Sequence, residues 1–172
     1  MPSDYQAPEH SIHEKTIRWH DAAQVAPLLR ARSGLEVMRG IKDGLLPPPP
    51  MVQMIGLRCV AADSGEVVTE LEHDGTIENA IGTLHGGAIV TTLDTAMACA
   101  AYTTLEAGSV VVTLDISTTF LRPIKSEDCP ISATGRVLSN SRRMIYATGE
   151  VRSLDGTLVA HAVGNFSVTK FA

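Results

Sequence analysis

A single carboxylate lies in the most apolar part of this sequence. Asp94 is the only charged residue between His85 and Glu106. A charged group in the middle of a buried helix costs free energy unless water, a partner group or a substrate compensates for it. Asp94 is therefore either a structural carboxylate that caps or bridges a group in the core, or a functional acid that takes part in chemistry.

Two glycines begin the same apolar stretch, directly after a histidine. In His85-Gly86-Gly87, the absence of side chains on the glycines allows a ligand to approach the backbone N–H groups closely. At the positive end of a helix dipole, such N–H groups suit a developing oxyanion. Asn79, six residues before His85, adds a neutral donor and acceptor. Taken singly, these residues also fit a tight loop with a hydrogen-bonded histidine and an ordinary turn asparagine.

The spacing of these groups restricts how they could act together. Gly86 and Asp94 are eight residues apart, which corresponds to about 12 Å along a helix. Groups that act on one carbonyl must converge to about 3 Å. If both are catalytic, a two-fold partner must present its own Asp94 to this chain's Gly86, with the two helices side by side and antiparallel. We therefore predict an isologous homodimer with two composite sites.

The element that carries these residues is a long helix, expected at about residues 86–106. Its side chains leave almost no polar face, and a helix that is apolar all round must be covered all round. A strongly curved sheet that wraps the helix would provide this cover, and a second subunit would close any remaining gap.

Six segments have the pattern of β-strands, at residues 54–62, 66–72, 110–121, 129–138, 142–153 and 157–169. The sequences Asp63-Ser64-Gly65 and Asp155-Gly156 indicate hairpin turns, and Asn140 is expected in a third turn. Short connections predict antiparallel pairing of successive strands. The expected fold class is α+β, a sheet with one principal helix.

A helical extension is expected before the sheet. Residues 1 to about 20 are predicted to be flexible, with Trp19 as a possible anchor. Ser33 and Glu36 have the spacing of a capping box that begins a helix, and Gly44 is a plausible stop. The four prolines at 47–50 are expected to be extended. We therefore predict an extension over residues 1–50 and a core domain over residues 51–172.

Composition excludes several classes of function. The 172 residues, 44% of them apolar, suit one domain, and a net charge of −5 does not steer the chain to nucleic acid. Three cysteines, with no Cys-x-x-Cys, argue against a disulfide framework and a zinc site, and the isolated histidines give no metal-ligand spacing. The longest apolar stretch, 88–102, is too short to span a membrane. We expect a cytoplasmic protein without metal or membrane association.

Several motifs occur in an order that resembles one family. Asn79-x5-His85-Gly86-Gly87, with Asp94 nine positions after the histidine, is followed by Phe120-Leu121-Arg122-Pro123, Ser141-Arg142-Arg143 and Asp155-Gly156-Thr157-Leu158-Val159-Ala160-His161. This pattern resembles the phenylacetate-pathway (PaaI-like) type of hotdog-fold acyl-CoA thioesterase, over about residues 46–170. The resemblance implies a curved antiparallel sheet of about six strands around one long central helix.

The resemblance also implies a role for each site residue. Asp94 would be the nucleophile or the general base that activates water, and the sequence does not decide between these roles. The N–H of Gly86, with or without that of Gly87, would polarise the thioester carbonyl. Asn79 would help to hold the water or the thioester, and His85 would shape the loop near the carbonyl. Thr113 falls where relatives carry a small hydroxyl residue near the acid.

Substrate-binding residues follow from the same resemblance. Arg142 and Arg143 would meet the phosphates of coenzyme A, since arginine suits phosphate geometry, and Arg122 is a further phosphate candidate. Without the resemblance, these arginines could equally be solvated charges at a hairpin tip and a strand end. We expect the acyl pocket between two central helices, lined by residues such as Leu93 and Met97.

Two alternatives to thioester hydrolysis remain open. A hotdog hydratase or dehydratase would pair an acid with a histidine a few positions later, but no histidine follows Asp94 until His161. An acyl-CoA sensor would bind without catalysis, and the N-terminal region carries basic residues mixed with acidic ones but no clear helix-turn-helix. The expected enzyme is a homodimer, or more often in relatives a homotetramer, and it needs no cofactor other than the coenzyme A of its substrate.

Overall fold

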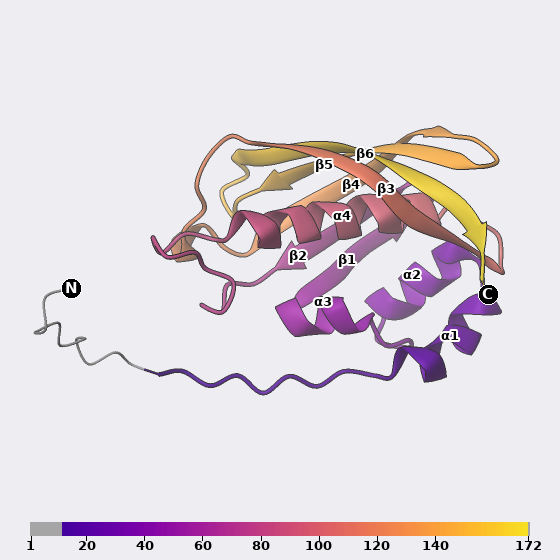
Figure 1. Ribbon diagram of the computed structural model, residues 1–172, viewed down its shortest axis with the longest axis horizontal. Helices are drawn as coiled ribbons and strands as arrows, with labels where there is room; N and C mark the ends of the chain where they lie inside the picture. The colour runs from indigo at the N-terminus through magenta and orange to yellow at the C-terminus, as the bar shows by residue number, and fades with distance from the viewer. Residues whose placement is uncertain (1–11, 172) are drawn as a thin grey trace, which may run out of the picture.

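The computed structural model describes residues 12–171, which form a curved sheet, a long helix and three short helices (Figure 1). The elements in chain order are α1 (Ala22–Arg30), α2 (Gly34–Lys42), α3 (Pro50–Ile55), β1 (Leu57–Asp63), β2 (Glu66–Leu71), α4 (Gly86–Tyr102), β3 (Ser109–Phe120), η1 (Ser126–Asp128), β4 (Ile131–Asn140), β5 (Met144–Arg152) and β6 (Leu158–Lys170). The first part of the predicted flexible segment, residues 1–11, lies outside the described residues.

All neighbouring strands in the six-stranded sheet are antiparallel, and their order is β1-β2-β4-β5-β6-β3. The sheet arches over α4 (Figure 1), so the α+β hotdog architecture is confirmed. The pairing of successive strands is wrong at one place. β3 does not pair with β4; it pairs along its whole length with β6, from Ser109↔Lys170 to Phe120↔Ala160. The connection from Phe120 to Ile131 contains the 3₁₀ turn η1 and is long enough to cross to the other side of the sheet.

The helix α4 begins at Gly86, as expected, and ends at Tyr102 rather than near Glu106. The hydroxyl of Thr103, the C-cap residue, donates to the carbonyl of Ala100 at 2.6 Å and accepts from the N–H of Gly65 at 2.8 Å. One side chain thus ends the helix and ties it to the β1–β2 turn. On the sheet side, Gly135 of β4 lies directly against α4, because a Cβ there would be 2.2 Å from the carbonyl oxygen of Ala96.

The β1–β2 hairpin is confirmed, with Ser64-Gly65 as its turn and Gly65 at φ +80°. β1 begins later than predicted, because Met54 belongs to α3. Pro50 is likewise helical rather than extended. It occupies the first turn of α3, where a missing N–H is harmless. Gly56, in the left-handed region at φ +75°, ends this helix and starts the strand.

The remaining strand boundaries lie within a few residues of those expected. Asn140 differs in role: it is the last residue of β4 and pairs with Ile145, so the turn consists of residues 141–143. No helix among residues 12–171 has the length and apolarity needed to cross a membrane.

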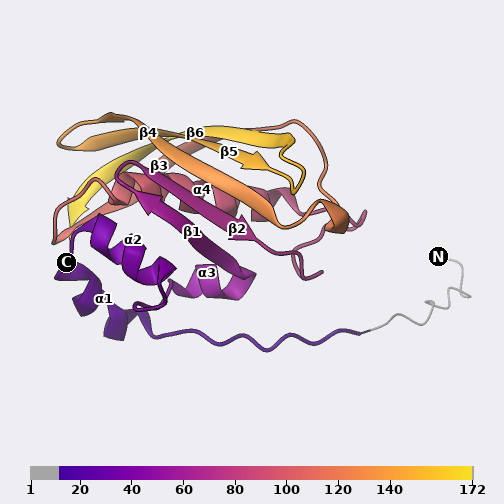
Figure 2. The ribbon, with the colours of Figure 1, turned by 180° about the vertical axis from the view of Figure 1, so that it is seen from behind.

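The helix α2 packs against β1 and α4, and its predicted capping box between Ser33 and Glu36 is present. Figure 2 shows α2 and α3 beside β1, with α1 farther from the strand, below α2. Val37 and Met38 of α2 are buried. Gly34 allows close approach, since a Cβ there would lie 1.8 Å from the carbonyl oxygen of Tyr102. Trp19 does not act as an anchor, because 64% of its surface is exposed.

Candidate active site

Asp94 lies in the middle of α4, partly exposed, and receives a hydrogen bond from β3. The hydroxyl of Thr113 donates to the Asp94 carboxylate at 2.8 Å. β3 carries an irregularity at this point: Thr113 pairs with Phe166 and Asp115 with Asn165, so one extra residue lies between them. Such a bulge changes the direction of a side chain at the sheet edge. The sequence placed Thr113 near the acid by resemblance, and the structure brings the two side chains together.

The N-terminus of α4 offers one backbone donor, not two. His85 is the N-cap residue, and its Nδ1 accepts a hydrogen bond from the N–H of Gly87 at 2.8 Å. The Gly87 amide therefore already has a partner, so in this chain Gly86 rather than Gly87 fits the role of oxyanion donor. The N–H of Gly86 has no hydrogen-bond partner among residues 12–171. The Phe120 ring lies 3.4 Å from the position that a Cβ on Gly86 would take.

The Asn79 side chain forms hydrogen bonds within its own loop. Its Nδ2 donates to the hydroxyl of Thr83 at 2.8 Å, and its Oδ1 accepts from the N–H groups of Ile81 and Thr83 at 3.0 and 3.3 Å. Among the described residues, no hydrogen bond joins the Asn79 side chain to His85 or Asp94. Within one chain, Asn79 thus supports the loop that leads into α4.

The side of α4 that carries the candidate acid is partly exposed and lies beside the edge strand β3. Leu93, Ala96 and Met97 are buried, whereas Gly87 and Asp94 on another side of the helix keep contact with solvent. Because α4 is continuous from Gly86 to Tyr102, Gly86 and Asp94 remain separated by about 12 Å along the helix axis. Within one chain, the acid and the free amide are therefore too far apart to act on the same carbonyl.

Leu93 and Met97 do not line an open pocket in this chain. Both are 0% exposed, and they point at β5, where a Cβ on Gly149 would lie 3.0 Å from the side chain of each. The expectation that they line an acyl pocket between two helices is therefore wrong for this face of α4. Because nearly all side chains of α4 are apolar, the sequence did not show which of them face the sheet.

The candidate phosphate-binding arginines fall at opposite ends of α4. Arg142 and Arg143 are exposed in the β4–β5 turn, close to the helix C-terminus, since Asn140 beside them donates to Thr104 at 2.9 Å. Arg122 is exposed after β3 and lies near the helix N-terminus, where the N–H of Leu84 donates to the carbonyl of Ile124 at 2.8 Å. The structure thus does not bring the three arginines together in one chain.

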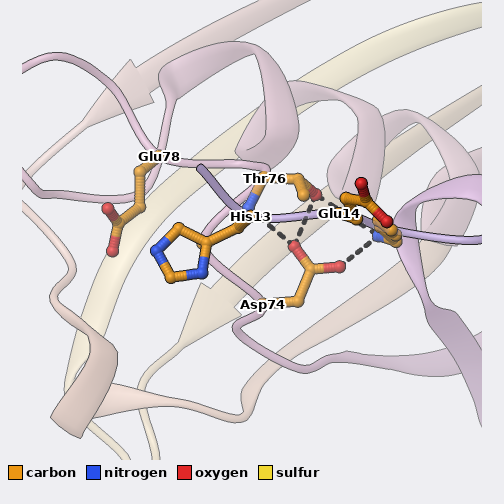
Figure 3. Close-up of a pocket in the computed structure, with 7 residues that line it drawn as sticks. His13, Glu14, Asp74, Thr76 and Glu78 are labelled. Carbon is orange, nitrogen blue, oxygen red and sulfur yellow. Dashed lines mark hydrogen bonds and ion pairs between the residues drawn. The ribbon is translucent and has the colours of Figure 1, made fainter. Parts of the chain in front are cut away.

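A polar hollow lies between residues 13–15 and the loop 74–78 (Figure 3). Lys15 forms an ion pair with Asp74, and the N–H of Thr76 donates to Asp74 at 2.9 Å. Partial burial raises the pKa of Asp74, but the hydrogen bonds from Lys15 and Thr76 outweigh it, so the net pKa is lowered. Sequence reasoning missed this contact, because no local pattern connects residues so far apart. Among the described residues no cluster of His, Cys, Asp or Glu could hold a metal ion.

Comparison with known proteins identifies the family. The family model described as "Thioesterase superfamily" matches residues 81–160, the part of the chain that carries His85, Gly86, Asp94 and Thr113. Human acyl-coenzyme A thioesterase 13 is 33% identical over 103 residues, which are 59% of this chain and 71% of the human protein.

Two solved structures share the fold. The E. coli PaaI protein from the phenylacetic acid degradation operon has a TM-score of 0.69 at 20% identity, covering 81% of this chain and 97% of that chain. The smu.793 protein from Streptococcus mutans UA159, bound to acetyl CoA, has a TM-score of 0.61 at 26% identity, and the match covers 66% of this chain and 89% of that chain. This chain therefore belongs to the thioesterase superfamily of hotdog-fold thioester hydrolases.

Proposed function

We propose that this protein hydrolyses acyl-CoA thioesters to the free acid and coenzyme A, at a site that two copies of the chain build together. One observation carries the proposal. The acid Asp94, held by Thr113 at 2.8 Å, and the unpartnered amide of Gly86 lie on one helix, but too far apart to meet. A two-fold axis beside the partly exposed face of α4 that carries Asp94 would join each Asp94 to Gly86 of the partner subunit.

The same axis divides the substrate contacts between the two chains. With antiparallel helices, the C-terminal end of one α4 runs beyond the N-terminus of the other. Arg142 and Arg143 would then lie on the same side of the dimer as Asp94 of their own chain. Arg122 would come from the partner subunit together with its Gly86. Arginines from both chains could therefore approach the coenzyme A phosphates.

The chemistry needs only these groups and water. The Gly86 amide, at the positive end of the α4 dipole, stabilises the negative charge on the carbonyl oxygen. Asp94 either takes a proton from water, which attacks the acyl carbon, or attacks that carbon itself to form an anhydride that water then opens. In both routes the C–S bond breaks, coenzyme A leaves as the thiolate and gains a proton, and water supplies the new oxygen of the acid.

The relatives support coenzyme A esters as the substrate class. A protein that covers a similar core at 33% identity is named an acyl-coenzyme A thioesterase, and a structure at 26% identity was solved with acetyl CoA. The proposed reaction uses no metal and no cofactor other than the coenzyme A of the substrate.

The first test removes the acid. Asp94→Asn keeps the size of the side chain, and we expect turnover to fall at least about 100-fold, the usual loss for an acid–base group. Thiol release should be followed with short, long, branched and aryl-acetyl CoA esters. Wild-type turnover in Asp94→Asn would contradict the assigned role. Absence of thiol release from every ester by the wild-type enzyme would favour the sensor alternative instead.

The second test removes the backbone donor. Gly86→Pro deletes one N–H at a helix position that accepts proline, and His85 before it already has the extended φ −66° and ψ 133° that a following proline requires. We expect a loss of about 10²–10³ in kcat, as for one oxyanion donor. Gly86→Ala is the matched control, because it keeps the N–H and its Cβ fits at 3.4 Å from Phe120.

Co-expression of the two inactive chains tests the shared site directly. In a mixed dimer, the Gly86→Pro chain supplies an intact Asp94 and the Asp94→Asn chain supplies an intact amide, which restores one site of two. Half of the randomly assembled dimers are mixed, so we expect about one quarter of wild-type activity. No recovery, or a fully active monomer in light scattering, would refute the composite site. A homotetramer built from two such dimers would show the same recovery.

A further inference from the structure

The N-terminal arm, residues 12–20, reaches the loop that leads into α4. The arm carries no helix or strand, and all of its residues are exposed. It runs from α1 back along the molecule toward the end where α4 begins (Figure 1). There the Lys15 side chain forms its ion pair with Asp74 and donates to the hydroxyl of Thr76 at 3.3 Å. The side chains of the ion pair are only 29% and 32% exposed, so Lys15 packs against the loop although the arm around it is open to solvent.

A short series of hydrogen bonds continues from this ion pair to the start of α4. The Asp74 carboxylate accepts from the N–H of Thr76 at 2.9 Å (Figure 3). The next residue, Ile77, is buried, and its carbonyl accepts from the N–H of His85 at 2.8 Å. His85 is the N-cap residue of α4. Two adjacent loop residues, Thr76 and Ile77, therefore connect the ion pair to the N-cap.

The direction of the Gly86 amide depends on His85. The loop fixes the N–H of His85, and the His85 side chain holds the N–H of Gly87 at 2.8 Å. Gly86 lies between these two anchored residues, and its own N–H has no partner among residues 12–171. A glycine has wide backbone freedom, so its neighbours determine where its N–H points. A shift of His85 would turn this N–H away from the carbonyl oxygen, and an error of about 1 Å can cost about 100-fold in rate.

We infer that Lys15 and Asp74 are positioning residues for the oxyanion donor: the N-terminal arm holds the loop, and the loop holds His85 and Gly86. The inference rests on the proposed thioester hydrolysis and gives the N-terminal arm a function in it. Neither Lys15 nor Asp74 touches the substrate. The competing explanation is an ordinary solvated ion pair, which would contribute little to stability and nothing to catalysis.

The first test removes the charge on each side of the ion pair. Lys15→Met keeps most of the length of the side chain, and Asp74→Asn keeps an oxygen that can accept from Thr76. We expect kcat to fall about tenfold in each variant with KM unchanged. This is less than the loss of about 10²–10³ for a deleted donor, because the amide is misplaced rather than absent. The double variant should lose no more than either single one, since both substitutions remove the same contact.

Lys42→Met is the matched control for Lys15→Met. Lys42 also forms an ion pair with an aspartate, Asp43, and its side chain is 34% exposed, close to the value for Lys15. It lies at the end of α2, away from the loop. Lys42→Met should therefore keep the wild-type kcat.

Coupling to Gly86 distinguishes positioning from a general structural effect. In the Gly86→Pro background the donor is already gone, so the addition of Lys15→Met should lower kcat no further. A fall of about tenfold in both backgrounds would show that Lys15 acts elsewhere and would overturn the inference. A wild-type kcat in Lys15→Met would overturn it as well, and so would an equal fall in Lys42→Met.

NMR of the free protein separates this inference from the proposed function. After labelling with ¹⁵N-glycine, the Gly86 amide signal is the one that Gly86→Pro removes. Lys15→Met should move this signal by more than its line width, whereas Lys42→Met should leave it in place. If the wild-type protein releases no thiol from any ester but the signal moves in Lys15→Met, hydrolysis fails and the positioning of the amide stands. If esters are hydrolysed but the signal stays in place in Lys15→Met, the inference is refuted.

Discussion

Gly135→Ala tests how the sheet holds α4 in place. A Cβ on residue 135 would lie 2.2 Å from the carbonyl oxygen of Ala96, 2.3 Å from its carbonyl carbon and 2.6 Å from the backbone nitrogen of Met97. Ordinary van der Waals contact begins near 3.4 Å, so the oxygen contact is short by 3.4 − 2.2, or about 1.2 Å. All three atoms belong to the helix backbone, so no rotation of a side chain can relieve the clash. The helix must move away from β4.

The expected cost affects both stability and activity. Overpacking of a core typically costs about 1–3 kcal/mol, and each kcal/mol lowers the melting temperature of a chain of this size by about 2–4 °C. We therefore expect a fall of about 2–12 °C. Movement of α4 also disturbs the 2.8 Å hydrogen bond between Thr113 and Asp94. A misplacement of about 1 Å can cost about 100-fold in rate, so kcat should fall well below the wild-type value even at temperatures where the variant is folded.

Gly149→Ala is the matched control for this substitution. It adds the same methyl group to the neighbouring strand β5, facing the same helix, but the nearest atoms are side-chain atoms of Leu93 and Met97 at 3.0 Å. These flexible groups can shift. Circular dichroism melting curves and thiol-release kinetics on both variants give the comparison. A Gly135→Ala protein that melts within about 1 °C of the wild type and keeps its turnover would refute the packing argument.

Three further outcomes follow from the site. Thr113→Val removes the hydrogen bond to Asp94 and should lower kcat about tenfold, whereas Thr113→Ser keeps the hydroxyl and should retain most activity. Equal losses of kcat in both variants would show that this hydrogen bond does not support catalysis. Arg142→Ala and Arg143→Ala should raise KM for coenzyme A esters but not for pantetheine esters, which lack the nucleotide phosphates. Burial raises the pKa of Cys99 to about 12, so the folded protein should be alkylated at Cys99 much more slowly than the unfolded chain at neutral pH. The free energy of folding that depends on the neutral Cys99 thiol should be complete below the thiol's ordinary pKa and be lost as pH rises toward 12. Equal labelling rates for the folded and unfolded protein would contradict this.

Part of this structure could be predicted from local sequence patterns. The start of α4 at Gly86 follows from glycines after a cap residue, and the α2 start follows from the Ser33–Glu36 capping box. The turn at Gly65 could be predicted because a glycine, which readily adopts the left-handed backbone conformation, stands between two segments with the pattern of strands. The two-chain site stays a prediction: it follows from the spacing between Gly86 and Asp94 if both residues are catalytic, because the rise of a helix per residue is fixed.

The missed features depend on contacts between distant parts of the chain. The apolar run at Met54 suits a strand or a helix equally, and the choice was made by Pro50, which starts a helical turn, and by Gly56, which ends it. The pairing of β3 with β6 depends on how the sheet closes around α4. Leu93 was assigned to the wrong face of the helix, because a helix that is apolar all round has no polar stripe to show its orientation.

Three sides of α4 have different surroundings. The stripe that contains Leu93 faces β5, the stripe of Cys99 and Tyr102 faces α2 and β1, and Asp94 lies on a partly exposed stripe beside the edge strand β3. Under the proposed dimer, each site takes its acid from one chain, while the oxyanion donor Gly86 comes from the other. Variants that affect the acid should therefore fail to rescue each other in mixed dimers, whereas each should be rescued by a chain defective only at Gly86. This division follows from helix geometry alone and does not depend on whether Asp94 attacks the substrate or activates water.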